Sequence, residues 1–188
     1  MEIQNLYFIA IIPPEDVCDE IITIQRYLAD RFQTRKSLKV VPHITLKAPF
    51  ACLATEHQNV VDWFDRLHLS VKPFSVELND FGSFPNSKQP VIYIKPEENQ
   101  SLTELQKSLL SQFQTIFPEN EVKKLELIFR PHLTVAYRDL KPEFFRVAWK
   151  EFSVRKYGAS FDVGHIHLLL HDQVKWNLIR SLALNGLA

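Results

Sequence analysis

The feature that most constrains the fold is a short motif of proline, histidine, a hydrophobic residue and threonine, which occurs twice about half the chain apart. The first copy is Pro42-His43-Ile44-Thr45 and the second is Pro131-His132-Leu133-Thr134. An apolar strand pattern and a helix pattern precede each copy, and further helix and strand patterns follow it. Because self-similarity along a chain indicates a repeated structural unit, the sequence predicts a duplicated βαβαβ unit.

The first half shows strand and helix patterns in alternation. The β-branched and aromatic run over 6–12 predicts a buried strand that ends at Pro13. Apolar residues then recur at helical steps from 17 to 32. A second strand is predicted over 40–47, and the pair Thr55 and Gln58 predicts the capped start of a second helix. Alternation over 74–78 predicts a half-buried strand.

The second half repeats this order. It predicts a strand over 91–95, a helix that Ser101 and Glu104 open as a capping box, and an apolar strand over 125–137. A short helix from Pro142 and strands over 161–170 follow. Between the halves, the Gly-, Pro- and Asn-rich segment 80–90 predicts a linker. We therefore expect one bilobal domain over 1–188, with lobes of about 1–84 and 85–188 and an exchange of terminal strands left open.

Composition excludes several classes of protein. The 188 residues are 46% hydrophobic and 23% charged, which is too apolar for a disordered chain. Lys and Arg number 22, as do Asp and Glu, so there is no overall positive charge to clamp duplex nucleic acid. Two cysteines and an opening apolar run too short for a membrane span predict a cytoplasmic protein without a membrane segment.

The two motifs pair an imidazole with a hydroxyl. In a strand, residues i and i+2 share a face, so His43 projects beside Thr45 and His132 beside Thr134. If the two units face each other across a cleft, one imidazole can act as a base and the other as an acid. Threonine hydroxyls can bind phosphoryl oxygens as charge builds on them. This arrangement suits phosphodiester chemistry without a metal.

Positive charge gathers around both motifs although the whole chain is neutral. The segment 31–47 contains five basic residues and no acidic residue, and basic residues outnumber acidic ones over 123–141. An anionic ligand such as phosphate is the natural counterpart. One His-x-Thr on a strand is more often incidental than functional, but two copies at corresponding positions of a duplication favour a site.

These residues resemble the 2H phosphoesterases, a family that includes proteins named 2′-5′ RNA ligases. Its members carry two His-x-Thr/Ser-hydrophobic motifs about half a chain apart, as here. The opening strand, Lys47 after the first motif, the segment 81–85 and Phe129-Arg130-Pro131 before the second motif extend the resemblance over nearly the whole chain. It implies an α+β bilobal fold with antiparallel sheets around a central cleft, and metal-independent cyclic phosphodiesterase chemistry.

The resemblance also implies the reaction. We expect hydrolysis of a 2′,3′-cyclic phosphate, at an RNA end or on a nucleoside, to a 2′-phosphate, with weak reverse 2′-5′ RNA ligase activity. By analogy, His132 is the base, His43 the acid, and Thr45 and Thr134 complete the catalytic set. The expected role is RNA processing by a monomer with no cofactor and no metal.

Four further residues are predicted to bind the phosphate or the rest of the substrate: Lys47, Arg130, Tyr137 and Arg138. RNA-processing members often have arginine five residues after the second motif histidine, where this chain has Tyr137, and arginine follows as Arg138. Because side chains alternate along a strand, these two side chains are expected to face opposite ways.

Two other functions remain open. The chain could be a noncatalytic module that binds nucleotides or RNA ends, or a hydrolase of another small cyclic nucleotide phosphate; turnover separates these readings. His165 and His167 share a strand face and make a metal site conceivable, but a polar face on a terminal strand is the simpler interpretation. Trp63, Trp149 and Trp176 are predicted to pack in the core or between lobes, with stacking of one on a base left open.

Overall fold

In the part of the chain that the structure describes, eight strands form one antiparallel sheet in the order β6-β3-β4-β5-β2-β1-β7-β8. The computed structural model describes residues 2–120 and 122–186. The strands are β1 Gln4–Ile11, β2 Ile44–Leu53, β3 Phe74–Phe84, β4 Val91–Pro96, β5 Leu133–Ala136, β6 Gly158–Val163, β7 His165–His171 and β8 Trp176–Ala183. The predicted α+β fold with antiparallel strands is confirmed.

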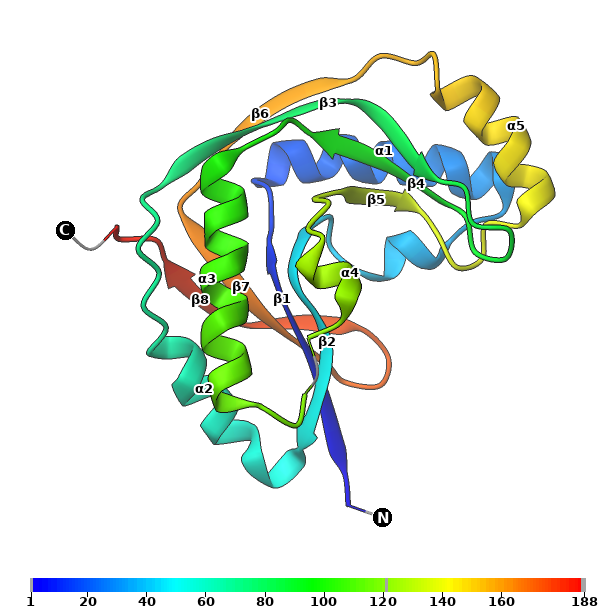
Figure 1. Cartoon of the computed structure of the whole chain (residues 1–188). Coiled ribbons are helices and arrows are strands. Elements are labelled where there is room, and N and C mark those ends of the chain that lie inside the picture. The colour runs from blue at the N-terminus through cyan, green and yellow to red at the C-terminus, as the bar shows by residue number, and fades with distance from the viewer. Residues whose placement is uncertain (1, 121, 187–188) are drawn as a thin grey trace.

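The sheet consists of two groups of four strands that meet at the motifs. Between β2 and β5, the register of the described residues is the pair Ile44 and Leu133, which are the hydrophobic residues of the two motifs. All other neighbouring strands pair over longer stretches. The sheet curls strongly about this central junction (Figure 1). The junction therefore brings the two motif strands side by side.

Within residues 2–120 and 122–186, five α-helices cover the sheet: α1 Glu15–Phe32, α2 His57–Asp65, α3 Gln100–Ile116, α4 Lys124–Leu127 and α5 Pro142–Phe152. Two 3₁₀ turns, η1 Lys36–Lys39 and η2 Ala54–Glu56, precede and follow β2. Helix α1 packs against β5 and α5, whereas α3 packs against β2 and α2 packs against β8. Each group of strands is thus covered by one helix from the first half of the sequence and one from the second.

The strand groups are interleaved in the same way. Strand β3 ends the first half of the sequence but lies between β4 and β6. Strand β7 belongs to the second half but lies between β1 and β8. Neither group therefore derives from one continuous half of the chain.

From Tyr7 to Ile11, strand β1 is buried on both faces. Tyr7, Ile9 and Ile11 point into the main hydrophobic core, while Phe8 and Ala10 belong to a smaller cluster on the opposite face. This division follows from the two-residue period of a strand. The smaller cluster supports one wall of the site described below. Among the described residues, no helix has the length and apolar character needed to cross a membrane.

Several predicted boundaries were wrong. The strand predicted over 40–47 begins at Ile44 because η1 and an extended segment precede it, and it continues to Leu53. The strand predicted over 125–137 is mostly helix α4 and a loop, and β5 begins at Leu133. Part of the predicted linker, residues 80–84, belongs to β3.

The predicted caps were also misplaced. Helix α3 begins after Asn99, whose side chain accepts a hydrogen bond from the Leu102 backbone at 2.9 Å, so Asn99 rather than Ser101 is the N-cap. Helix α2 has Glu56 at its N-cap and no side-chain cap bond, so the box of Thr55 and Gln58 does not form. The start of α5 at Pro142 agrees with the sequence, because the first helical position has no need of a backbone N–H.

Candidate active site

His43 lies immediately before β2, at the junction of the two strand groups. Its Nδ1 lies 2.7 Å from the backbone carbonyl oxygen of Val41. The ring also packs on Phe8 of β1, with ring centroids 4.8 Å apart. These contacts hold the imidazole in one orientation next to Thr45.

His132 has an equivalent position before β5. Its Nδ1 lies 2.8 Å from the backbone carbonyl oxygen of Arg130. The rings of Phe84 and Tyr93 meet it edge to face, at 5.2 and 5.5 Å between centroids. Tyr93 reaches this position across Gly82, where an added Cβ would come within 2.5 Å of the tyrosine ring.

The two backbone contacts determine which ring nitrogen is available. A carbonyl oxygen only accepts hydrogen bonds, so Nδ1 of both histidines carries the proton. In a neutral ring, Nε2 is then the atom with a free lone pair. Each ring can therefore accept a proton at Nε2 and, once charged, donate it from the same atom.

Burial lowers the pKa values of both histidines. The pKa of His43 falls to about 4, chiefly because desolvation penalises the charged ring; the Val41 carbonyl opposes this shift and the neighbouring His132 adds to it. Desolvation also lowers the pKa of His132, against the effect of the Arg130 carbonyl. Both imidazoles are therefore neutral at pH 7 in the free protein.

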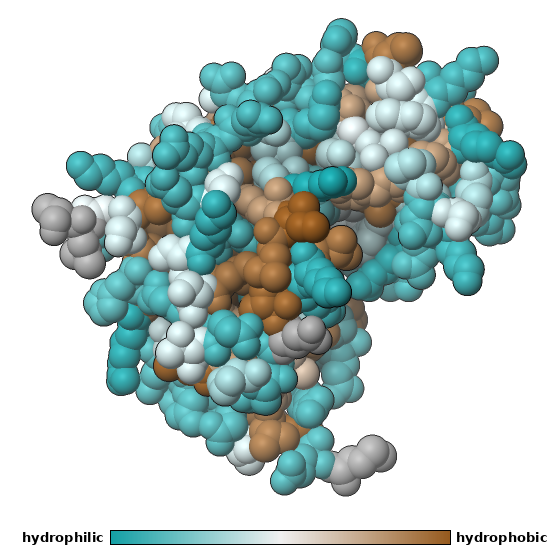
Figure 2. All heavy atoms as spheres, viewed as in Figure 1, coloured by the Kyte–Doolittle hydropathy of each residue, from teal (hydrophilic) through white to brown (hydrophobic). Residues whose placement is uncertain are grey.

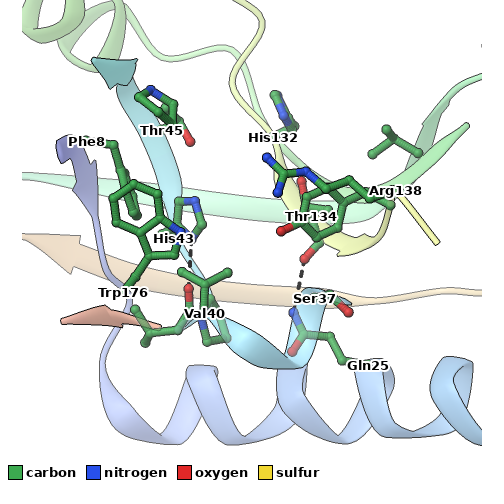
Figure 3. Close-up of a pocket in the computed structure, with 15 residues that line it drawn as sticks. Phe8, Gln25, Ser37, Val40, His43, Thr45, His132, Thr134, Arg138 and Trp176 are labelled. Atoms are coloured by element: carbon green, nitrogen blue, oxygen red, sulfur yellow. Dashed lines mark hydrogen bonds between the residues drawn. The ribbon is translucent and has the colours of Figure 1, made fainter. Parts of the chain in front are cut away.

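The two histidines open into one cavity of about 230 Å³. Figure 3 shows His43 beside Phe8 and Trp176, with His132, Thr134 and Arg138 across the cavity from them. We call this cavity the histidine cleft. Its lining residues are Phe8, Gln25, Ser37, Val40, Val41, Pro42, His43, Thr45, Pro49, Val91, His132, Thr134, Tyr137, Arg138 and Trp176.

Tyr137 and Arg138 line the same cavity, so the expectation that they face opposite ways was wrong. Strand β5 ends at Ala136, and strand alternation no longer applies beyond it. Arg138 has a positive φ of 57°, and its guanidinium lies 5.1 Å from the centre of the Tyr137 ring. The turn thus brings a cation to the cleft within two residues of the strand end.

Lys47 does not reach the histidine cleft, which does not support the phosphate contact predicted for it. Its side chain is 1% exposed, and its Nζ lies 3.1 Å from Oε1 of Glu126. The Nζ also lies 4.6 Å from the centre of the Phe113 ring. In this position the ammonium group is paired inside the protein.

A β-bulge explains the placement of Lys47. In a regular strand, Lys47 would share the face of Thr45. Instead, Ile9 of β1 pairs with Lys47 while the next residue, Ala10, pairs with Thr45. The extra residue in β2 interrupts the alternation and turns the lysine towards the core.

Arg130 is exposed but lines a different cavity from the histidine cleft. Its contribution to His132 comes from its backbone carbonyl. The guanidinium therefore lies beside the reaction site and does not line it.

Among the lining residues that the sequence did not predict as site residues, four carry aromatic or polar side chains. The sequence predicts Phe8 as part of a buried strand and Trp176 as a packing residue. In the structure, the centroids of their rings lie 4.5 Å apart, and the two rings form one wall of the histidine cleft. Gln25 and Ser37 are each 1% exposed, and Oε1 of Gln25 and Oγ of Ser37 have no hydrogen-bond partner among the described residues. Gln25 Nε2 donates to the Thr134 carbonyl at 3.1 Å. The sequence signal for Gln25 was a single glutamine among the apolar residues of the helix predicted over 17–32.

His165 and His167 lie on one face of β7, with ring centroids 6.5 Å apart. Nδ1 of His167 lies 2.9 Å from the Ser181 hydroxyl of β8. Over the part of the chain that the structure describes, no group of three or more His, Cys, Asp or Glu side chains could hold a metal ion. The metal interpretation of this pair thus gains no support.

Comparison with known proteins agrees with this geometry. The model of the 2′-5′ RNA ligase superfamily matches residues 13–175. A protein of Geobacillus kaustophilus named "Putative phosphoesterase" is 26% identical over 182 residues, 96% of either chain. A Bacillus cytotoxicus protein of the same name is 30% identical over 143 residues, 74% of this chain and 76% of its own length.

Solved structures show the same fold. Escherichia coli LigT has a TM-score of 0.69 at 19% identity and covers 97% of this chain and 99% of its own. TT0787 of Thermus thermophilus has a TM-score of 0.66 at 20% identity, with coverage of 96% and 98%. With the family match over most of its length, the chain belongs to the 2′-5′ RNA ligase superfamily of 2H phosphoesterases.

Proposed function

We propose that the protein hydrolyses 2′,3′-cyclic phosphates, at RNA ends or on nucleosides, to 2′-phosphates. The observation that carries this proposal is the equivalent setting of His43 and His132, which leaves Nε2 of each ring available in one cavity. A cyclic phosphodiester needs a base on the side of the attacking water and an acid on the side of the leaving oxygen. Two such imidazoles supply both.

The reaction follows from these positions. Nε2 of the neutral imidazole takes a proton from water as the water oxygen attacks phosphorus. The bond between phosphorus and the 3′-oxygen breaks, and the charged imidazole donates its proton to that oxygen. The product is the 2′-phosphate. Hydroxyls of Thr45 and Thr134 and the guanidinium of Arg138 stabilise the charge that grows on the phosphoryl oxygens.

The pKa values do not separate the two roles. Desolvation lowers the pKa of both His43 and His132, and the charge of His132 lowers the pKa of His43 further, so the two rings titrate as a coupled pair. We therefore keep the assignment that the family resemblance implies, with His132 as the base and His43 as the acid.

The ligands of a structural neighbour support a nucleotide substrate. Structures of Escherichia coli LigT are complexes with 3′-AMP, with ATP and with phosphate. In this chain, Phe8 and Trp176 provide an aromatic wall beside His43 on which a base or a sugar face can pack. In the histidine cleft, separate residues thus bind the phosphate and the nucleoside.

The test is incubation of the purified protein with uridine 2′,3′-cyclic phosphate and with an oligonucleotide ending in a 2′,3′-cyclic phosphate, in excess EDTA. We expect the 2′-phosphate from the wild type, and a loss of about 10²-fold or more in kcat for His43→Ala and His132→Ala. The matched control is His165→Ala, because His165 is exposed and lies outside the cleft. Failure of the wild type to turn over either substrate would overturn the proposal.

A sulfur substitution separates the acid from the base. When the 3′-oxygen of the cyclic phosphate is replaced by sulfur, the leaving thiolate needs no proton. We expect this substrate to restore turnover to the variant that lacks the acid, His43→Ala, and not to His132→Ala. Rescue of His132→Ala instead would reverse the two roles.

A further inference from the structure

A second cavity adjoins the histidine cleft and shares part of its wall. It has a volume of about 570 Å³, and Thr45, Val91 and His132 line both cavities. We call it the α4 cavity, after the helix at its edge. The histidine cleft, at about 230 Å³, is smaller than the roughly 300–1,000 Å³ of most small-molecule sites. A substrate longer than one nucleotide has the α4 cavity as its next space beyond His132.

The walls of the α4 cavity are largely apolar and partly open to solvent. Leu125 of α4 is 84% exposed and Ile128 is 62% exposed. Phe84 and Phe129 complete this surface. Figure 2 shows apolar atoms gathered near the middle of the molecule, in the region where α4 lies in Figure 1. Apolar side chains left exposed together in this way mark a binding surface.

Polar groups stand at defined points around these walls. Arg130 lines the cavity next to His132, and Asn86 and Gln89 line it from the loop between β3 and β4. Oδ1 of Asn86 accepts the backbone N–H groups of Lys88 and Gln89, at 2.8 and 3.1 Å, which holds the loop in shape. The amide N–H groups of Asn86 then remain to donate to a ligand.

Apolar walls with polar groups at defined points match a nucleotide better than they match a hydrocarbon chain. A base has flat faces that pack on apolar and aromatic side chains, and amide side chains can bond its edges. A guanidinium pairs with phosphate. A hydrocarbon chain would use the walls of the α4 cavity but leave Arg130, Asn86 and Gln89 without a role.

The cavity wall is held in place before a ligand binds. The carboxylate of Glu126 on α4 accepts the Lys47 ammonium and the Ala48 backbone N–H, at 3.1 and 2.8 Å. It also accepts the Lys123 backbone N–H at 2.9 Å. These bonds connect α4 to the strand that carries Thr45, so the α4 cavity and the histidine cleft have a fixed relation to each other.

We propose that the α4 cavity binds the nucleotide that precedes the cyclic phosphate, and that the substrate is therefore an RNA end of at least two nucleotides. Arg130 pairs with the phosphate that joins the two nucleotides, and the apolar walls hold the preceding base. The reacting nucleoside stays in the histidine cleft. This inference rests on the proposed function, from which it selects RNA ends over cyclic mononucleotides.

The first experiment compares kcat/KM for uridine 2′,3′-cyclic phosphate with kcat/KM for a dinucleotide that ends in the same group. We expect the dinucleotide to be preferred by about tenfold, the value of one stacked base. The double variant Leu125→Ser/Ile128→Ser should lose this preference. The control is Leu127→Ser, because Leu127 is 67% exposed on the same helix but does not line the cavity.

The second experiment measures binding without turnover. The probe is a dinucleotide 2′-phosphate with 2-aminopurine as its first base, whose fluorescence falls when the base stacks. We expect quenching with wild type and Leu127→Ser, and much weaker quenching with the double variant. Equal quenching by all three proteins would overturn the inference.

The two inferences fail in different ways. If the wild type hydrolyses both substrates without a length preference, or if the double variant loses equal activity on both, the proposed function stands and the α4 cavity does not bind the preceding nucleotide. If neither substrate is turned over, the proposed function fails, and the 2-aminopurine titration still decides whether the α4 cavity binds a base.

Discussion

At the scale of single residues, the structure gives the two histidines the same local environment. Each follows a proline and directs Nδ1 at the carbonyl of the residue two positions earlier. Each also packs against at least one aromatic ring. The sequence predicted the pairing of imidazole and hydroxyl because the motif itself encodes it. It did not predict the aromatic partners, which come from other strands.

We expect kcat/KM to depend on pH with a maximum on the acid side of 6.5, the ordinary histidine value. In the proposed mechanism, the active form has one charged and one neutral imidazole. Since burial lowers the pKa values of both rings, the pair loses its single proton as pH rises towards neutrality and gains a second proton only at lower pH. The phosphate anion raises both pKa values in the complex, so kcat should peak at a higher pH than kcat/KM.

Steady-state rates between pH 4 and 9 test this expectation. The control is a substrate-binding measurement at each pH, which separates loss of affinity from loss of the charged acid. A kcat/KM profile that rises to a maximum above pH 7 would contradict the assignment of two desolvated histidines.

Lys47 and Glu126 form a buried ion pair, and we expect Lys47→Met to lower the free energy of unfolding by about 3–5 kcal/mol. The variant leaves the Glu126 carboxylate buried without its cation. The double variant Lys47→Met/Glu126→Gln should lose much less, because it removes the unpaired charge as well. Chemical denaturation measures both, and Lys39→Met, at an exposed lysine of η1, is the control.

The same variants test the phosphate contact that the sequence predicted for Lys47. If Lys47 is structural, the folded double variant should bind uridine 2′,3′-cyclic phosphate, which does not use the α4 cavity, with a KM close to that of the wild type. A large rise in KM with unchanged stability would return Lys47 to the phosphate site.

At the scale of elements, one carboxylate connects the end of β5 to the 3₁₀ turn before His43. Asp139 accepts hydrogen bonds from the Thr34 hydroxyl at 2.9 Å and from the backbone N–H groups of Arg35 and Lys36 at 2.8 and 3.1 Å. Turn η1 contributes Ser37 to the histidine cleft, and Val40 and Val41 follow it. The hydrogen bonds of Asp139 thus fix one wall of the histidine cleft relative to the segment that follows β5, the strand that carries Thr134.

We expect Asp139→Ala to lower the free energy of unfolding by about 1–3 kcal/mol and to raise KM. It leaves the buried Thr34 hydroxyl and two N–H groups without their acceptor. Asp30→Ala is the control: Asp30 pairs with the side chain of the same Arg35, at 3.3 Å, but both groups are largely exposed. In thermal unfolding, the Tm of Asp30→Ala should be almost the same as that of the wild type. Equal losses for both variants would argue against the bridging role of Asp139.

The errors in element prediction have a common cause. Leu125, Leu127 and Ile128 are apolar and were read as a strand, but they are exposed in and after a short helix. Hydrophobic periodicity assigns structure on the assumption that apolar side chains are buried. That assumption fails here, because Leu125 and Ile128 line an open cavity and Leu127 is exposed beside it.

At the scale of the whole molecule, the overall charge of zero leaves few contacts for the phosphates of the proposed RNA substrate. With few cations at the site, we expect a plot of log kcat/KM against log salt concentration to have a slope between about −0.5 and −1.5 for a dinucleotide substrate, since each single-strand phosphate contact contributes about −0.7. Lengthening the RNA should leave this slope unchanged. Steady-state rates between 50 and 300 mM salt measure it, and a slope that steepens with length would indicate an extended RNA surface.

Taken alone, the sequence determined the family, the chemical character of the site and the order of most elements. These properties reside in local patterns: two His-x-Thr motifs, helical and strand periodicities, and clusters of basic residues. Only the tertiary structure decided that α1 covers β5 while α3 covers β2, that β3 joins strands of the second half while β7 and β8 join strands of the first, and that Lys47 turns inwards. The physical reason is that local periodicity specifies which face of an element is apolar, whereas the partner of that face depends on contacts between residues far apart in the chain.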